Sequence, residues 1–183
     1  MRITIIGQSG AGKSTLAKAL AAEFSLTHVE LDAINWQPGW VDLHGLDLPE
    51  FLRRVEAATA VETWVADGNY GPAQDLLWEK ATDVVWLDYG LATILPRVIS
   101  RSFARAVEGK ELWAGTGNTE TFARWFSLDH PILYTLRTFR RNRVRRIERS
   151  ADPRWAGLRL HRLRHPRDVA PLMALLATTH SMG

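Results

Sequence analysis

Residues 7–15 have the types and spacing of a loop that binds phosphate. They read Gly-Gln-Ser-Gly-Ala-Gly-Lys-Ser-Thr and fit the pattern GxxxxGK(S/T) in full. The glycines let backbone N–H groups turn inward around a polyphosphate, and a helix that begins near Gly12 adds the positive end of its dipole. In this motif Lys13 reaches the β- and γ-phosphates and the Ser14 hydroxyl binds Mg²⁺. The residues expected to hold the phosphates of ATP are Gly7, Ser9, Gly10, Ala11, Gly12, Lys13, Ser14 and Thr15.

Three aspartates follow predicted strands, where ligands bind in open parallel sheets. Asp67 is the expected metal-side residue, because Mg²⁺ that bridges phosphates needs hard oxygen ligands. Asp88 competes for that role, or it caps the following helix. Asp32 can orient or deprotonate an acceptor hydroxyl, or it caps a loop.

Arginines form a second set of candidates. Arg97, Arg101 and Arg105 are spaced i, i+4, i+8, which places them on one face of a predicted helix. Like charges on one face repel one another without an anion, so Arg97 and Arg101 are expected to face phosphate. Arg137 and Arg141 share a face of a later helix and are expected to reach a transferring phosphate. The expected catalytic residues are Lys13, Asp32, Arg97, Arg101, Arg137 and Arg141.

The charge of the chain is unevenly distributed. The net charge is only +3, yet twelve arginines lie between positions 137 and 167, opposed in that stretch by Glu148 and Asp152 alone. Such a block is typical of a surface that binds nucleotide phosphates, nucleic acid or acidic lipid headgroups. The alternative is a solvated helix face.

Two tryptophans and one histidine lie close to these residues in the sequence. Trp36 and Trp40 flank a Gln-Pro-Gly turn beside Asp32, so a base or sugar could stack on them. They are equally compatible with core residues under a loop. His28 lies inside a predicted strand and is interpreted as a hydrogen-bonded core residue.

Alternating strand and helix patterns must position these residues. Apolar strands are predicted at 2–6, 27–31, 63–66, 83–87 and 157–163. Helices are predicted at 13–24, 49–60, 72–79, 91–108, 130–149 and 167–178. This alternation indicates an α/β fold with a parallel sheet covered on both faces. Residues 109–129 interrupt it with several glycines and are predicted to be an insertion that is functional or mobile.

Length and composition limit the class of protein. A chain of 183 residues with 46% hydrophobic content is expected to form one globular domain, 1–183. No apolar run approaches the roughly 18 residues that a membrane span needs. The chain has no cysteine and no secretion signal, so we expect a cytoplasmic protein without disulfides.

The motifs together resemble the adenylate-kinase-like P-loop kinases over nearly the whole chain. Asp67-Gly68 looks like the Asp-Gly that follows the third strand of nucleoside monophosphate kinases. Arg97 and Arg101 are similar to the arginines that contact adenine and phosphates in that family, and Arg164 occupies the place of its adenine-side loop. The resemblance implies a three-layer P-loop fold with strand order 2-3-1-4-5 and a lid-type insertion at 109–146.

A narrower bacterial group, labelled DNA topology modulation protein or adenylate-kinase-like protein, is more similar. The shared segments are Leu-Asp at 31–32, Trp-x-Pro-Gly-Trp at 36–40 and Trp-Val-x-Asp-Gly-Asn-Tyr at 64–70. Asn69-Tyr70 replaces the usual apolar-Pro-Arg of nucleoside monophosphate kinases, so one substrate-phosphate arginine is absent. A carboxylate at Asp32 is instead similar to kinases of hydroxyl acceptors, such as shikimate, gluconate and nucleoside kinases.

The sequence therefore predicts an ATP- and Mg²⁺-dependent phosphotransferase, with Mg²⁺ held by Ser14 and Asp67. Its acceptor would be a small hydroxyl or phosphate compound. One alternative is a DNA-associated ATPase or regulator that uses the block at 137–167. Another is a nucleotide-binding protein with little catalysis. We expect no membrane partner, and nucleic acid is the less favoured partner.

Overall fold

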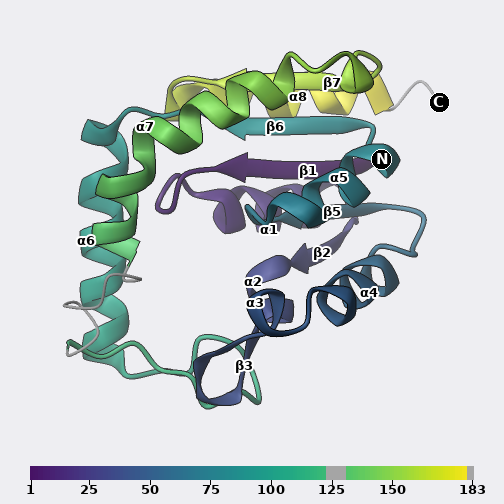
Figure 1. The fold of residues 1–183 in the computed structure, drawn as a ribbon. Coiled ribbons are helices and arrows are strands. Elements are labelled where there is room, and N and C mark those ends of the chain that lie inside the picture. The colour runs from purple at the N-terminus through teal and green to yellow at the C-terminus, as the bar shows by residue number, and fades with distance from the viewer. Residues whose placement is uncertain (123–130, 181–183) are drawn as a thin grey trace.

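A computed structural model describes residues 1–122 and 131–180. Within these residues a five-stranded parallel sheet has the spatial order β2-β5-β1-β6-β7 (Figure 1). Its strands are β1 (Arg2–Gly7), β2 (Thr27–Glu30), β5 (Trp64–Asp67), β6 (Asp83–Leu87) and β7 (Arg159–Leu163). Numbered along the chain as strands of this sheet alone, they lie in the order 2-3-1-4-5. The predicted α/β fold with a parallel sheet is confirmed.

Helices cover both faces of the sheet. The described helices of ten or more residues are α1 (Lys13–Phe24), α4 (Leu48–Ala58), α5 (Gly71–Lys80), α6 (Leu91–Glu108), α7 (Pro131–Ser150) and α8 (Val169–His180). Because successive side chains of a strand point to opposite faces, Ile3 and Ile5 enter one core and Ile6 enters the other. The first core includes side chains of α1, α6 and α8, and the second includes those of α4 and α5. None of the described helices is both long and apolar enough to cross a bilayer.

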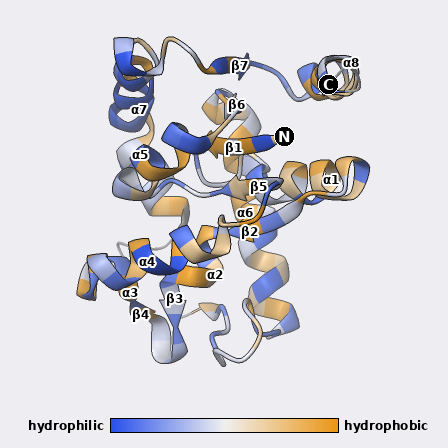
Figure 2. Ribbon diagram, turned by 90° about the vertical axis from the view of Figure 1, so that its right-hand side faces the viewer, coloured by the Kyte–Doolittle hydropathy of each residue, from blue (hydrophilic) through white to orange (hydrophobic). Residues whose placement is uncertain are grey.

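Helix α7 differs from the other long helices because it is largely hydrophilic (Figure 2). It packs beside α6, and its Ile132 and Phe139 side chains lie against the first core. Near its other end, the Arg149 guanidinium lies over the Trp78 ring of α5, 5.4 Å from the ring centroid. The helix therefore runs from α6 to α5. Between these ends it passes the start of the phosphate loop, where Gln8 donates a hydrogen bond to Thr138 of α7.

Between β2 and α4 the structure has short elements that the sequence did not predict. They are α2 (Leu31–Asn35), β3 (Trp36–Gln37), a 3-10 turn (Pro38–Trp40), β4 (Val41–Asp42) and α3 (Leu43–Leu46). The strands β3 and β4 pair antiparallel, with Trp36 opposite Asp42. Gly39 and Trp40 both have left-handed backbone angles, with φ of 72° and 62°. These angles close the turn between β3 and β4. Further 3-10 turns lie at Pro153–Trp155 and Pro166–Asp168.

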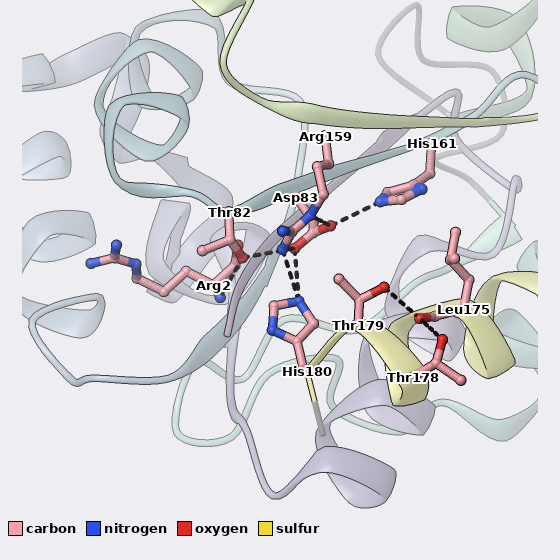
Figure 3. A network of polar contacts seen from close by, with 9 residues as sticks. All are labelled: Arg2, Thr82, Asp83, Arg159, His161, Leu175, Thr178, Thr179 and His180. Carbon is pink, nitrogen blue, oxygen red and sulfur yellow. Dashed lines mark hydrogen bonds and ion pairs between the residues drawn. The ribbon is translucent and has the colours of Figure 1, made fainter. Parts of the chain in front are cut away.

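At the edge of the sheet opposite the phosphate loop, one fully buried carboxylate joins three elements (Figure 3). Asp83, at the start of β6, accepts two hydrogen bonds from the Arg159 guanidinium, at 2.9 and 2.8 Å. His161 of β7 and His180 of α8 contact the same carboxylate at 2.8 and 3.2 Å. Burial alone would raise the pKa of Asp83, but the bonds from Arg159 and His161 outweigh it and hold the pKa well below its usual value.

We expect Asp83→Asn to lower the free energy of unfolding at pH 7 by about 2 kcal/mol, because bonds to a charged acceptor are lost. A depressed folded-state pKa contributes stability above the unfolded pKa of about 4, and this stability is lost as pH falls further. The wild-type protein should therefore lose more stability between pH 5 and pH 3 than the variant does. Urea unfolding at both pH values measures this, with Glu62→Gln as an exposed control. Equal pH dependence in wild type and Asp83→Asn would contradict the role of this carboxylate.

Candidate active site

The phosphate loop joins β1 to α1, and its glycines are required by its shape. Gly10 and Gly12 have φ of 78° and 95°, a left-handed region that other residues rarely adopt. A Cβ atom at Gly10 would also overlap the Val98 side chain of α6. Gly12 is the N-cap of α1, so the first N–H groups of that helix face the loop. The backbone has the shape of an anion cradle.

Asp67 lies beside the loop at the end of β5. Its Oδ2 accepts a hydrogen bond from the Ser14 hydroxyl at 2.6 Å, and the His28 Nε2 atom lies 2.7 Å from its Oδ1. These partners, from α1 and β2, fix both oxygens of the carboxylate. Asp67 is also only 3% exposed to solvent. His28 thus orients a candidate metal-side residue, whereas the sequence indicated only a hydrogen-bonded core histidine.

Ser14 and Asp67 fit a Mg²⁺ ion whose other ligands are phosphate oxygens and water. Mg²⁺ is usually bound by one or two carboxylates together with substrate phosphates, and it prefers oxygen ligands. Ser14 supplies a hydroxyl that lines the phosphate cavity, and Asp67 supplies a carboxylate hydrogen-bonded behind it. Across the described residues there is no cluster of three or more histidine or acidic side chains suited to a metal ion. An ion at this place would therefore depend on the nucleotide.

Asp88, the competing candidate for the metal-side carboxylate, is bound by two arginines. Its carboxylate accepts paired hydrogen bonds from Arg143, at 2.8 and 3.0 Å, and from Arg162, at 2.9 and 2.6 Å. Burial would raise its pKa, but the two guanidinium groups hold the pKa below its usual value. The alternative that Asp88 caps α6 is wrong, since the N-cap of this helix is Gly90 and no side-chain cap hydrogen bond is found there among the described residues.

Asp32 lies in the first turn of α2, across the loop from Asp67. The Tyr70 hydroxyl donates a hydrogen bond to its Oδ1 at 2.8 Å, so the carboxylate does not serve as a loop cap. Burial, together with the charge of Asp32, raises the pKa of Tyr70 and keeps its hydroxyl a donor. The neighbouring Asn69 side chain bonds both backbone groups of Gly7, at 3.2 and 2.7 Å. The β5–α5 connection therefore fixes the phosphate loop and Asp32 relative to each other.

Three positive side chains near the loop are half-buried. Burial lowers the pKa values of Lys13, Arg101 and Arg146, and Arg101 and Arg146 also act electrostatically on Lys13. Arg101 donates one hydrogen bond to the Ser9 hydroxyl at 3.1 Å, but among the described residues its buried Nε atom has no partner. A buried donor without a partner is costly, and a phosphate oxygen is a suitable acceptor.

Arg146 is a residue near the site that the sequence did not single out as an individual candidate; it acts electrostatically on Lys13 but lines neither of the two cavities described below. It lies on α7, which the loop anchors through a hydrogen bond of 3.1 Å from Gln8 Nε2 to Thr138 Oγ1. Positions i, i+4 and i+8 of a helix share a face, so Arg146 lies on the side of Thr138. The buried Thr135 and Thr138 are the signal that could have identified this face.

Of the other predicted arginines, Arg97 and Arg105 lie near the phosphate loop: Arg105 lines the same cavity as Arg101, and the Arg97 guanidinium is 4.0 Å from where a Cβ atom of Gly12 would lie. Arg97 lies over the Tyr89 ring, 5.9 Å from its centroid, and Arg105 pairs with Glu120 at 3.9 Å. Arg137 and Arg141 are exposed on α7 and do not line the cavities described below. Arg164 is also exposed, on the turn after β7. The functional roles of these residues stay predictions.

The described part of the predicted insertion packs against the β3–β4 hairpin. The Trp113 ring lies 6.4 Å from that of Trp36 and 5.8 Å from that of Trp40. The Asn118 side chain accepts a hydrogen bond from the Trp40 N–H at 2.9 Å and donates one to the Gln37 carbonyl at 2.9 Å. The predicted lid, 109–146, includes residues 123–130, which lie outside the described residues. In its described N-terminal part, Leu112, Trp113 and Glu120 line the smaller of the two cavities described below.

Two adjoining cavities meet at the phosphate loop. One, of about 420 Å³, is lined by the loop, α6 and the insertion. The other, of about 790 Å³, is lined by α2, the β3–β4 hairpin and residues 68–71. Both cavities are bordered by Ser9, Lys13, Asp32, Trp36 and Trp40. A phosphate donor and a second ligand can therefore meet between Lys13 and Asp32.

The fold is that of the P-loop kinases. The chain is similar over its whole length to shikimate kinase from Aquifex aeolicus, with a TM-score of 0.54, 14% identity and 99% of that chain covered. It is also similar to shikimate kinase from Bacteroides thetaiotaomicron, with a TM-score of 0.52, 16% identity, and 97% of this chain and 98% of that one covered. At such identities the likeness establishes the fold alone.

The particular family is established by sequence. The chain belongs to the same family as the uncharacterized protein YqaC of Bacillus subtilis (strain 168), with 32% identity over 130 residues. The match covers 69% of this chain and 71% of YqaC. No family model matches the chain. Membership of the DNA topology modulation group stays a prediction.

We expect Arg101→Met to weaken binding of pyrophosphate about tenfold or more, because a charge-assisted hydrogen bond contributes about 1.5–3 kcal/mol. Without ligand the variant should be at least as stable as the wild type, since a half-buried cation with an unpartnered donor is removed. Calorimetric titration and thermal unfolding measure both effects. Arg145→Met, an exposed position on α7, is the matched control. Equal pyrophosphate affinity in the two variants would show that Arg101 does not face the anion.

Proposed function

We propose that the protein is an ATP-dependent phosphotransferase that phosphorylates a hydroxyl group of a small molecule. One observation carries the proposal: a cavity containing Asp32 opens onto the phosphate loop at Lys13. A phosphate-binding site alone would serve any nucleotide-binding protein. A carboxylate in a second cavity, next to the end of the phosphate chain, is what transfer to an acceptor requires.

In the proposed reaction an acceptor hydroxyl oxygen attacks the γ-phosphorus of ATP. A new O–P bond forms, the bond from that phosphorus to the β–γ bridging oxygen breaks, and ADP leaves. Asp32 orients the hydroxyl and receives its proton, while the Tyr70 hydroxyl holds the carboxylate in place. Lys13 and Arg101, which line the smaller cavity, neutralise the charge of the transferred group, and Arg146 adds positive charge near Lys13.

The proposed cofactor is Mg²⁺ bound through Ser14 and Asp67. When bound, the ion neutralises phosphate charge. His28 supports this role by fixing one oxygen of Asp67. We assign nucleotide contacts to Arg97 and Arg164 on the sequence resemblance alone. A lid at 109–146 that brings Arg137 and Arg141 to the phosphate also belongs to the proposal, supported by the packing of Trp113 over the site.

No specific observation favours the alternative of a DNA-associated regulator. Much of the arginine block is engaged in ion pairs within the protein. The paired arginines are Arg143 and Arg162 with Asp88, Arg149 with Asp75, Arg154 with Asp152, and Arg159 with Asp83. Guanidinium groups paired in this way are less available to a polyanion, so the block is a weaker nucleic-acid surface than its composition indicates.

We expect Lys13→Ala to reduce ADP formation at least about 10²-fold, because a group that stabilises the transferred phosphate is removed. ADP formation from ATP is to be measured with a panel of sugars, nucleosides, nucleotides and hydroxy acids, and with single-stranded and duplex DNA. Lys80→Ala, on α5 and away from the loop, should behave as the wild type. Unchanged turnover in folded Lys13→Ala would exclude the proposed function. Strong stimulation by DNA alone would favour the regulator.

A further inference from the structure

The larger cavity lacks the positive side chains that would bind an anionic acceptor, apart from Lys13 of the phosphate loop, among the described residues. Its charged lining residues, among those that the structure describes, are Lys13, Asp32 and Asp42. Lys13 belongs to the phosphate loop, so the acceptor side has two carboxylates and no arginine of its own. A carboxylate or phosphate on the acceptor would meet two like charges without a partner cation.

Two residues that line the same cavity have buried polar atoms without a hydrogen-bond partner among the described residues. Asn35 is fully buried, and its Oδ1 accepts a hydrogen bond from the His44 N–H at 2.8 Å. Its Nδ2 group and the His44 Nε2 atom are both buried, and neither has a hydrogen-bond partner among the described residues. Buried polar groups are normally paired, so an acceptor oxygen on a ligand would satisfy the Asn35 amide.

Aromatic side chains form the remaining walls. Trp36 and Trp40 lie edge to face, 5.6 Å apart, at the border of the two cavities. Tyr70 and Tyr134 line other parts of the cavity. Flat rings of this kind bind the apolar face of a sugar or a base. The cavity therefore offers ring surfaces, one amide donor and negative charge.

We infer that the acceptor carries no negative charge and is an uncharged or amine-bearing polyhydroxyl compound with an apolar ring face, such as a sugar or a nucleoside. The inference rests on the proposed phosphotransfer function and selects the substrate class within it. Asp32 takes the reacting hydroxyl, Asn35 binds a second oxygen, and Trp36 and Trp40 contact the ring face. Asp42 excludes anions and favours an amine.

Matched pairs of acceptors test this inference. Each pair keeps the ring and the primary hydroxyl and differs mainly in charge: adenosine and 3′-AMP, uridine and 3′-UMP, glucose and glucose 1-phosphate, with glucosamine as the amine-bearing arm. We expect kcat/KM for phosphoryl transfer from ATP to be at least about tenfold higher for the uncharged member of each pair that reacts. Comparing the nucleosides with the sugars shows which of these two kinds of compound the protein phosphorylates.

The charge of Asp42 is tested separately. Asp42 is exposed, so Asp42→Asn is expected to fold normally. The variant should narrow the difference between uncharged and anionic acceptors severalfold and should weaken the reaction of glucosamine. Glu62→Gln, which removes an exposed charge elsewhere, should change neither ratio.

The outcomes separate the inference from the function on which it rests. Preference for the anionic members, or equal kcat/KM within pairs, would overturn the inference while leaving a Lys13-dependent phosphotransferase in place. Transfer to no member of the panel would overturn the proposed function and the inference with it. Preference for uncharged members that Asp42→Asn leaves unchanged would overturn the role of Asp42.

Discussion

The partial burial of positive charge around the phosphate loop is the constraint on which the rest of the site depends. Lys13, Arg101 and Arg146 come from three helices, and burial disfavours the charged form of each. Asp32 and Asp67 offset part of this cost for Lys13. A phosphate bound in the cavity that Lys13 and Arg101 line would offset the rest of this cost for those two cations. The cations are thus in place in the absence of an anion, as the proposed phosphotransfer requires.

The rest of the fold keeps these groups in position. Gln8 ties α7 to the loop, Asn69 ties the β5–α5 connection to Gly7, and His28 ties β2 to Asp67. Two buried aspartates on β6 and just after it, Asp83 and Asp88, join that strand to β7, and Asp88 also joins it to α7. Five of the twelve arginines of the arginine-rich region thus have a structural role in guanidinium–carboxylate pairs, four of which attach α7 and β7.

Local patterns in the sequence predicted the features that depend on local physics. The apolar strands, the long helices and the phosphate loop all follow from periodicity or from a motif of consecutive residues, and the structure has them close to the predicted bounds. The short α2 and the β3–β4 hairpin were missed because their stability comes from packing, notably of Trp113 and Asn118 against the hairpin. The partners of the arginine block were missed because Asp88 lies 55 residues from Arg143 in sequence. For the same reason Arg146 and His28 carried no signal of their own.

A crystal structure of the protein with ADP and Mg²⁺ is the most direct test of the site. The β-phosphate should lie within residues 7–15, with Lys13 and the Nε atom of Arg101 in contact with phosphate oxygens. The Mg²⁺ ion should lie against the Ser14 hydroxyl, with Asp67 still accepting the hydrogen bond of that hydroxyl. Phosphates bound outside the loop, or an Arg101 side chain turned away from them, would contradict the view that the half-buried cations exist to hold a polyphosphate.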